Sequence, residues 1–198
     1  MKIRWIIVDG IDGSGKSTIA NMMKDRYEEE GDDVYLVAHP SERLLGKISR
    51  RALRGRGRVL KLVATIFYIL DVLNSVRLLK AIRKRYQTVI FVRYLMGAAY
   101  LPEELAPKGY RFFKNLLPLP SRLLLVDIDP EVALRRIAER DDHLEMFEDL
   151  DNLVKIRRKV LLLAGNDWDV IDNSGSEEES RKEVMKVLNH WDLHSKNK

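Results

Sequence analysis

Apolar positions along this chain form two kinds of pattern, short continuous runs and longer segments with a helical period. The continuous runs lie at 4–8, 34–38, 88–92, 122–128 and 168–171. Strands that are buried on both faces have this nearly unbroken apolar character. The helical segments lie between the runs, at 16–30, 60–86, 131–140, 150–164 and 176–191. Alternating strands and helices predict a single α/β domain, 1–198, with three layers: a five-stranded parallel sheet and helices on both of its faces.

Residues that start and stop helices stand at the borders of these segments. Gly31 follows the first helical segment and Gly165 follows the fourth, where glycine commonly ends a helix. Pro130 occupies a helix-start position, with Asp129 before it as the expected N-cap. The last segment opens with glutamates at 177–179, and acidic side chains favour the positive end of a helix. These signals support the borders drawn from the apolar pattern.

A glycine-rich loop directly follows the first strand. The residues "GIDGSGKS" at 10–17 match G-x-x-x-x-G-K-[ST], with a strand before and a helix after, as a phosphate-binding P-loop requires. Glycines let successive N–H groups point at a phosphate, and the helix dipole adds to their field. We expect Lys16 to reach the β- and γ-phosphates and Ser17 to ligate Mg²⁺. A turn that only joins strand to helix leaves this lysine and the hydroxyls after it unexplained. The predicted ATP-binding residues are Gly10, Asp12, Gly13, Ser14, Gly15, Lys16, Ser17 and Thr18.

The rest of the chain narrows the class of P-loop protein. GTPases read guanine with N-K-x-D, which does not occur in this sequence. The late D-x-x-G at 172–175 follows the last predicted strand, the wrong place for a switch loop. Two classes of function remain: phosphoryl transfer to a small acceptor, and ATP binding without phosphoryl transfer.

Composition restricts partners and compartment. The absence of cysteine excludes disulfides and thiolate metal sites and favours a reducing, cytoplasmic interior. The net charge of +5 suits anionic partners. Basic residues are dense at 50–58, and this density fits a solvated helix end as well as a phosphate-binding role. Nucleic acid binding is a weaker hypothesis, because no aromatic residues are interleaved with the basic ones. The uncharged apolar run 62–70 is too short to span a bilayer, so no membrane association is expected.

Several segments together resemble the thymidylate kinase family of nucleoside monophosphate kinases. The matching segments are "VDGIDGSGKST", "VRYLMGAAY", "LLLVDIDPEVALRRIAER" and "VIDNSGSEEE". The resemblance covers most of the chain. It implies the P-loop NTPase fold, ATP and Mg²⁺ as cofactors, a nucleoside monophosphate as acceptor with thymidylate the leading candidate, and commonly a homodimer.

The resemblance also implies roles for single residues. Arg93 would hold the acceptor phosphate, Asp12 would face the acceptor, and Tyr100 would lie near its sugar. Phe67 or Tyr68 would stack on the base, since a flat ring covers a base at low entropic cost. Because both lie in an apolar helical stretch, packing in the core is the alternative for at least one of them.

The chain departs from the family pattern at several charged positions. An aspartate is replaced by Val92, an acceptor-binding arginine by Val72, and an arginine of the lid, about 140–150, by Met146. Arg43 in the acceptor region, 39–100, and the catalytic candidate Arg140 are the expected replacements for the arginines. Asp9 is the second metal-ligand candidate beside Ser17. The losses leave a second hypothesis open, a nucleotide-binding regulator or degenerate kinase with another acceptor or none.

Overall fold

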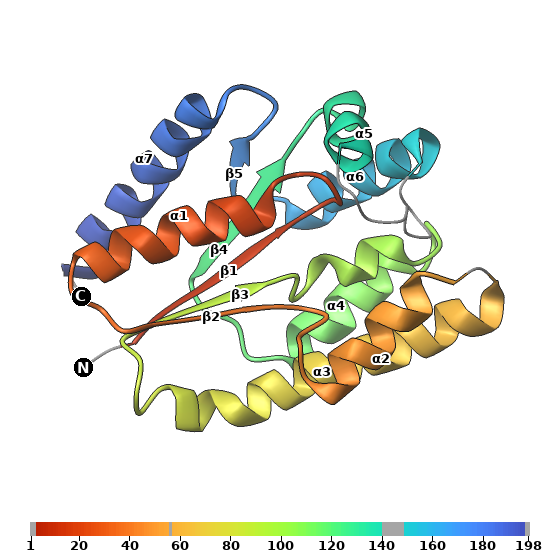
Figure 1. Ribbon diagram of the computed structural model, residues 1–198, viewed down its shortest axis with the longest axis horizontal. Helices are drawn as coiled ribbons and strands as arrows, with labels where there is room; N and C mark the ends of the chain where they lie inside the picture. Colours follow the sequence, from red (N-terminus) through yellow and green to blue (C-terminus); the bar gives the residue numbers. More distant parts are fainter. Residues whose placement is uncertain (1–2, 56, 140–148, 197–198) are drawn as a thin grey trace.

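The computed structural model describes residues 3–55, 57–139 and 149–196. These residues contain a sheet of five parallel strands in the order β2-β3-β1-β4-β5 (Figure 1). The strands are β1 (Arg4–Gly10), β2 (Val34–Ala38), β3 (Thr88–Val92), β4 (Arg122–Asp127) and β5 (Asp169–Asp172). All five predicted strands are thus confirmed, with ends that differ by at most two residues.

Helices cover both faces of the sheet. The helices are α1 (Lys16–Glu29), α2 (Leu44–Leu53), α3 (Arg58–Ile82), α4 (Ala106–Leu116), α5 (Pro130–Ala138), α6 (Leu150–Ala164) and α7 (Glu177–Lys196), with a 3₁₀ helix η1 (Met96–Tyr100) after β3. One face packs against α1 and α7, and the other against α3, α4, α5 and α6 (Figure 1). The three-layer architecture predicted from the sequence is confirmed.

Alternate residues of the central strand supply the two cores. Ile6 and Val8 of β1 pack on the α1 and α7 side, whereas Trp5 and Ile7 pack on the α3 side. These four side chains are at most 6% exposed. Complete burial of such a side chain contributes roughly 1.5–3 kcal/mol. Burial on both faces explains why the strand sequences show continuous apolar runs and no alternation.

Two helices and η1 were not predicted from the apolar pattern. Glycine or proline obscures the helical pattern in both sequences. Gly46 lies inside α2, and Pro107 and Gly109 lie in the first turns of α4. Gly46 is required by packing, because a Cβ there would lie 2.1 Å from the carbonyl oxygen of Ser41. The long helix α3 also begins and ends earlier than the predicted 60–86. These glycines and prolines therefore mark close packing and a helix start.

Helix α3 combines a polar anchor with an exposed apolar face. By length and composition Val59–Ile82 could cross a membrane, with a mean hydropathy of 1.8 over its most apolar 18-residue window, of which 22% is buried. The uncharged apolar run 62–70 did not reveal this length, because Lys61 and Asp71 end the run while the helix continues past both. Asp71 is fully buried and accepts hydrogen bonds from the N–H and Oγ of Ser41, both at 2.7 Å. The side of the helix that carries Asp71 therefore faces the interior of the protein.

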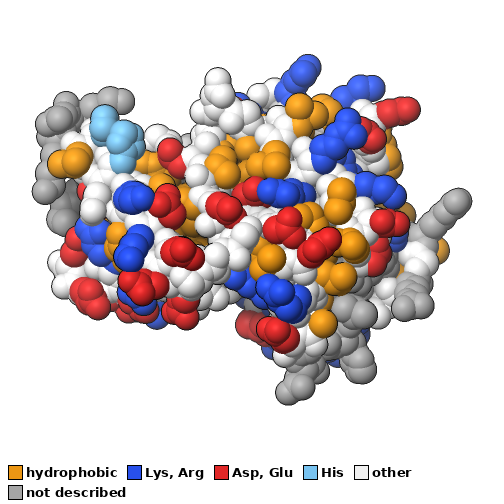
Figure 2. All heavy atoms as spheres, turned by 90° about the horizontal axis from the view of Figure 1, so that it is seen from above, with side chains coloured by type: hydrophobic (Ala, Val, Ile, Leu, Met, Phe, Trp, Pro, Cys, Tyr) orange, Lys and Arg blue, Asp and Glu red, His pale blue; other side chains and the backbone are white. Residues whose placement is uncertain are grey.

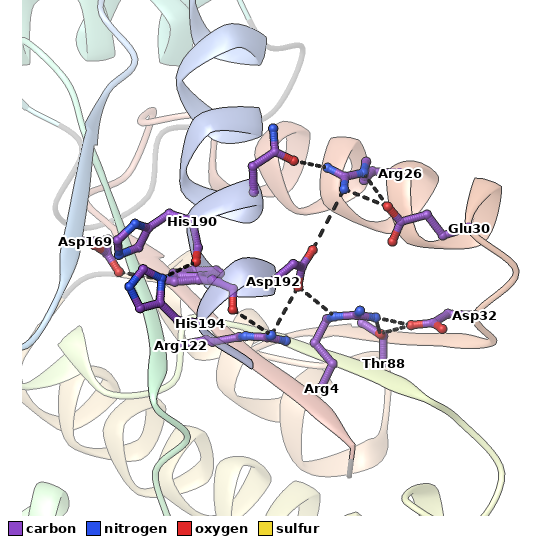
Figure 3. A network of polar contacts seen from close by, with 12 residues as sticks. Arg4, Arg26, Glu30, Asp32, Thr88, Arg122, Asp169, His190, Asp192 and His194 are labelled. Atoms are coloured by element: carbon purple, nitrogen blue, oxygen red, sulfur yellow. Dashed lines mark hydrogen bonds and ion pairs between the residues drawn. The ribbon is translucent and has the colours of Figure 1, made fainter. Parts of the chain in front are cut away.

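At the amino ends of the strands, an ionic network fastens α7 to the sheet (Figure 3). The carboxylate of Asp192 lies 3.1 Å from Arg122, 3.4 Å from Arg4 and 3.8 Å from Arg26. These arginines come from β4, β1 and α1. The C-terminal part of α7 is therefore held at the edge of the sheet opposite to the glycine-rich loop.

Candidate active site

The glycine-rich loop connects the carboxyl end of β1 to α1. Gly13 and Gly15 adopt left-handed conformations with φ of 75° and 80°, which side-chain-bearing residues adopt only with strain. Strand β1 lies in the centre of the sheet, between β3 and β4. Ligands of open parallel sheets bind at this kind of position, beyond the carboxyl ends of strands whose connections diverge.

The first turn of α1 has no side-chain cap and no acidic residue. Its N–H groups and the positive end of its dipole therefore face the loop without a carboxylate from the same turn. The side chain of Lys16 is buried and donates to the carbonyl oxygen of Ile11, within the loop, while Ser17 and Thr18 are exposed. These features fit a polyphosphate with a magnesium ion, since Mg²⁺ takes oxygen ligands from hydroxyls, carboxylates, water and the phosphates themselves.

Asp12, within the loop, links it to residues that follow β3. Its Oδ1 accepts a hydrogen bond from the guanidinium of Arg93 at 3.1 Å, and its Oδ2 accepts one from the hydroxyl of Tyr100 at 2.6 Å. Arg93 follows β3 directly and Tyr100 ends η1. The structure thus brings together three of the residues that the resemblance assigned to the acceptor side.

The charges in this cluster stabilise one another. Burial alone would raise the pKa of Asp12, but Arg93, Lys16 and the Tyr100 hydroxyl lower it to about 2. Burial and the neighbouring Asp12 carboxylate raise the pKa of Tyr100 well above its usual value, so its hydroxyl stays a donor. Burial alone would lower the pKa of Arg93, but Asp12, Tyr100 and Tyr68 together raise it above its usual value. Arg93 is therefore a permanent cation, and its partner Asp12 is a permanent anion near neutral pH.

The main chain of Arg93 is fixed in an unusual conformation. Among the described residues it is the one non-glycine residue with a positive φ, 58°. Its N–H donates to the carbonyl oxygen of Val8 at 3.0 Å, and its own carbonyl accepts from the hydroxyl of Tyr68 at 2.8 Å. A left-handed conformation costs a side-chain-bearing residue about 1–2 kcal/mol, and strain of this kind concentrates at functional sites.

Asp9 supports the turn that carries these residues. Its Oδ2 accepts hydrogen bonds from the N–H groups of Tyr94, Leu95 and Met96 at 3.0, 2.9 and 3.0 Å. The residue is 2% exposed. One oxygen of the predicted metal ligand is thus committed to the main chain, which the sequence pattern did not reveal.

Arg43 lies in a polar cluster between β2 and α3. Its guanidinium is 3.2 Å from Oδ1 of Asp71, and its Nε donates to Oγ of Ser41 at 3.0 Å. Arg43 also donates to the hydroxyl of Ser75. Neither Ser41 nor Ser75 was predicted to belong to a site, because no motif marks them. Arg43 is therefore anchored by the carboxylate next to Val72, and its contact with an acceptor stays a prediction.

His39 belongs to the same cluster and is structural in its contacts. Its Nε2 lies 2.7 Å from Oγ of Ser75, and its Nδ1 lies 3.2 Å from the carbonyl oxygen of Val92. Burial lowers the pKa of His39 to about 4, although the nearby Asp71 opposes the effect. The ring is neutral at physiological pH and supports the turn after β2, at the cis peptide between His39 and Pro40.

The two aromatic candidates of α3 differ in position. Tyr68 lines a small apolar cavity of about 50 Å³ between α3, η1 and α4, whereas Phe67 does not line it. A Cβ on Gly97 would lie 3.0 Å from the Tyr68 ring, so this ring packs closely against η1. Tyr68 is therefore the candidate beside Arg93.

The lid side is only partly described. Arg140 and Met146 lie outside the described residues. Before them, Arg136 of α5 donates to the carbonyl oxygen of Gly175 at 3.2 Å, in the loop between β5 and α7. In the same loop Asn173 donates to the carbonyl oxygen of Ser14 at 2.7 Å, a contact that sequence reasoning missed.

Charges of both signs are mixed over the described part of the surface that Figure 2 shows. In the basic segment 50–58, Arg50 pairs with Glu42 at 2.5 Å and donates to the carbonyl oxygen of Pro40 at 2.7 Å. Arg51 and Arg54 are exposed around the end of α2. These contacts fit the interpretation of the segment as a solvated helix end.

Comparisons with known proteins cover nearly the whole chain. A family model described as "Thymidylate kinase" matches residues 8–184. The chain is 30% identical over 191 residues to a probable thymidylate kinase of Archaeoglobus fulgidus, covering 92% of this chain and 93% of the relative. It is 28% identical over 193 residues to the thymidylate kinase of Leptospira borgpetersenii, covering 93% and 92%.

A solved structure is similar in fold. The thymidylate kinase of Candida albicans, whose structure is described as revealing the origin of broad substrate specificity, superposes with a TM-score of 0.66. The alignment covers 99% of this chain and 92% of the other at 19% identity. At this identity the likeness concerns the fold alone.

Proposed function

The chain belongs to the thymidylate kinase family, and we propose on this basis that it transfers the γ-phosphoryl group of ATP to dTMP, giving dTDP and ADP. The observation that carries the proposal is the Asp12 cluster, in which the glycine-rich loop is bonded to Arg93 and Tyr100. Such a link holds Arg93, the proposed acceptor-side cation, directly beside the loop. Two phosphate sites side by side are what transfer between nucleotides requires.

On the donor side, the proposed binding groups are the loop and the first turn of α1. Main-chain N–H groups of 10–17 bind the phosphates, and Lys16 neutralises charge between the β- and γ-phosphates. The Ser17 hydroxyl and the second carboxylate oxygen of Asp9 are the proposed holders of Mg²⁺. When bound, this ion neutralises charge on the β- and γ-phosphate oxygens.

On the acceptor side, the chain positions and neutralises the acceptor phosphate. Arg93 offers a planar fork to the phosphate oxygens, and Asp12 keeps that fork directed at the loop. Tyr100 and the ring of Tyr68 are proposed to contact the sugar and base. Little covalent work is needed from the protein in phosphoryl transfer, so orientation and charge carry the rate.

Two of the substituted family positions, Val92 and Val72, lie in the apolar interior. Val92 is 0% exposed and packs with α1, and Val72 is 3% exposed beside the small cavity. Neither leaves a buried charge without a partner. We propose that Arg43, held by Asp71 one residue before Val72, supplies the acceptor-side cation in place of the lost arginine, with Arg140 assigned to the lid.

A direct test is turnover with a panel of acceptors. The protein with ATP and Mg²⁺ should form ADP when dTMP is added, with dUMP, dCMP and AMP compared side by side. The Lys16→Ala variant is the control for contaminating kinases. Nucleotide binding without turnover on any acceptor would instead support the regulator hypothesis, which the family membership does not favour.

We also propose a cytoplasmic homodimer that covers the exposed face of α3. Val59, Leu62, Ile66, Leu70 and Leu73 are 37–74% exposed and recur every three or four residues, so they form one stripe along the helix. An apolar stripe of this spacing fits the equivalent stripe of a second copy about a two-fold axis.

Sedimentation velocity measures this association. Leu62→Glu should convert a dimer into monomers, since it places a charge within the stripe. The matched control is Leu162→Glu on α6, a leucine that is 73% exposed away from α3. A wild-type protein that is monomeric at every concentration would contradict the dimer, as would a dimer that Leu62→Glu leaves intact.

A further inference from the structure

Asn173 lies between the glycine-rich loop and α7 and makes a directed contact with each. Its Nδ2 donates to the carbonyl oxygen of Ser14 at 2.7 Å, and its Oδ1 accepts from the hydroxyl of Ser180 in α7. Its own N–H donates to the carbonyl oxygen of Asp127 at 2.9 Å, at the end of β4. Both ends of the amide and the main chain are thus engaged.

The contact is buried and closely fitted. Ser14, Asn173 and Ser180 are 0%, 6% and 2% exposed. A Cβ at residue 15 would lie 2.3 Å from Nδ2 of Asn173, so the amide reaches the loop only because Gly15 has no side chain. A buried hydrogen bond of this kind resists exchange with water, and losing one partner leaves the other unsatisfied.

The hydrogen bond to Ser14 also determines where the next amide points. In a planar trans peptide the carbonyl of residue 14 and the N–H of residue 15 point in opposite directions. Because the Ser14 carbonyl is directed at Asn173, the Gly15 N–H is directed away from it. This N–H is one of the amides of the glycine-rich loop that are proposed to bind the nucleotide phosphates.

Ser180 determines the orientation of the Asn173 amide. A side-chain amide that is turned over would place its oxygen against the Ser14 carbonyl, and two acceptors repel. The Ser180 hydroxyl also lies 3.0 Å from the carbonyl oxygen of Ser176, and its single proton serves one acceptor at a time. Asn173 Oδ1 is the closer of the two. The ionic network around Asp192 fixes the other end of the same helix, so Ser180 belongs to a firmly held element.

We propose that Asn173 is a positioning residue for nucleotide binding, which orients the Gly15 amide through Ser14, and that Ser180 acts on the loop through Asn173. The inference rests on the proposed function in assigning ATP and ADP to the loop. An aspartate could not replace this residue, since it donates no hydrogen bond and would add a negative charge beside the phosphates.

The experiment measures ADP affinity of the full chain by calorimetry, without any acceptor. We expect Asn173→Ala to weaken ADP binding about two- to tenfold and Asn173→Asp to weaken it further, by more than about tenfold. The KM for ATP should rise in parallel, whereas the KM for dTMP should stay within about twofold. Ser174→Ala is the control, because its hydroxyl lies in the same loop and bonds with Asp172 and Asp129. Its ADP affinity should equal that of the wild type.

The double variant Asn173→Ala/Ser180→Ala tests the chain of contacts. If Ser180 acts through Asn173, the double variant should bind ADP no more weakly than Asn173→Ala. Additive losses would overturn the role of Ser180. Wild-type ADP affinity in a folded Asn173→Asp protein would overturn the role of Asn173, even if its unfolding midpoint were lower. Because ADP binding needs no transfer, a wild type that does not phosphorylate dTMP would refute the proposed function while leaving this comparison interpretable.

Discussion

The Asp12 carboxylate is expected to contribute a pH-dependent part of the folding free energy. Burial raises its pKa, but Arg93, Lys16 and Tyr100 together lower it from 3.8 to about 2. The difference corresponds to about 2–2.5 kcal/mol in favour of the folded state when the group is ionised. Asp12→Asn removes the charge with little change in shape and leaves Arg93 without its counter-ion.

The sign follows from the direction of the shift. A depressed folded-state pKa stabilises the protein above the ordinary value of 3.8, and the contribution is lost as the pH falls toward about 2. The wild type should therefore exceed Asp12→Asn by about 2 kcal/mol in unfolding free energy at pH values from about 5 to 7. The difference should shrink to about half near pH 3.

Urea unfolding at a series of pH values measures this difference. The buried Trp5, Trp168 and Trp191 provide a fluorescence signal for the loss of tertiary structure. Asp25→Asn, on the exposed side of α1, controls for the change in net charge and should match the wild type at each pH. A gap between wild type and Asp12→Asn that is the same near pH 7 and near pH 3 would refute the reasoning, because no titrating contribution would then exist.

Four further variants, at three positions, separate donor, acceptor and backbone effects. Lys16→Ala should lower kcat about 100-fold or more in an ADP-release assay, since no other cation replaces its charge; near-normal turnover would contradict the site. Arg93→Ala and Arg93→Gly should both raise the KM for dTMP more than the KM for ATP. The glycine variant should be more stable to urea than the alanine variant by about 1 kcal/mol, because glycine tolerates the φ of 58°. Equal stability of the two would argue against strain. Tyr68→Phe should lower kcat/KM for dTMP about two- to tenfold at an unchanged KM for ATP, and an equal effect on both substrates would contradict its role in holding Arg93.

Local sequence signals predicted the sheet well and some of the helices poorly. Strands such as β3 are buried throughout and almost entirely apolar because both faces are covered, and this property is visible within five residues. Helices α2 and α4 each contain a glycine for a reason outside their own sequence. Gly46 is small because Ser41 lies against it, and that contact is known only once the turn after β2 is folded.

The candidate site was likewise predicted from the sequence only in part. The glycine-rich loop is continuous in sequence and was predicted from spacing alone. The contact between Asp12 and Arg93 spans 81 positions, and only the family resemblance brought these residues together beforehand. The hydrogen bonds of Tyr68 and Asn173 could not be predicted, because each uses a side chain without a motif to fix a main-chain carbonyl far away in sequence.

These main-chain contacts bear on how the chain tolerates its substituted family positions. Val92 and Val72 stand where the family has charged residues, and each packs in one of the two cores. The proposed transfer requires the placement of Arg93 beside the loop. That placement is set by Val8, Tyr68 and Asp12, none of which is among the substituted positions. Because phosphoryl transfer depends mainly on positioning and charge neutralisation, these contacts support the proposed role of Arg93 despite the substitutions at Val92 and Val72.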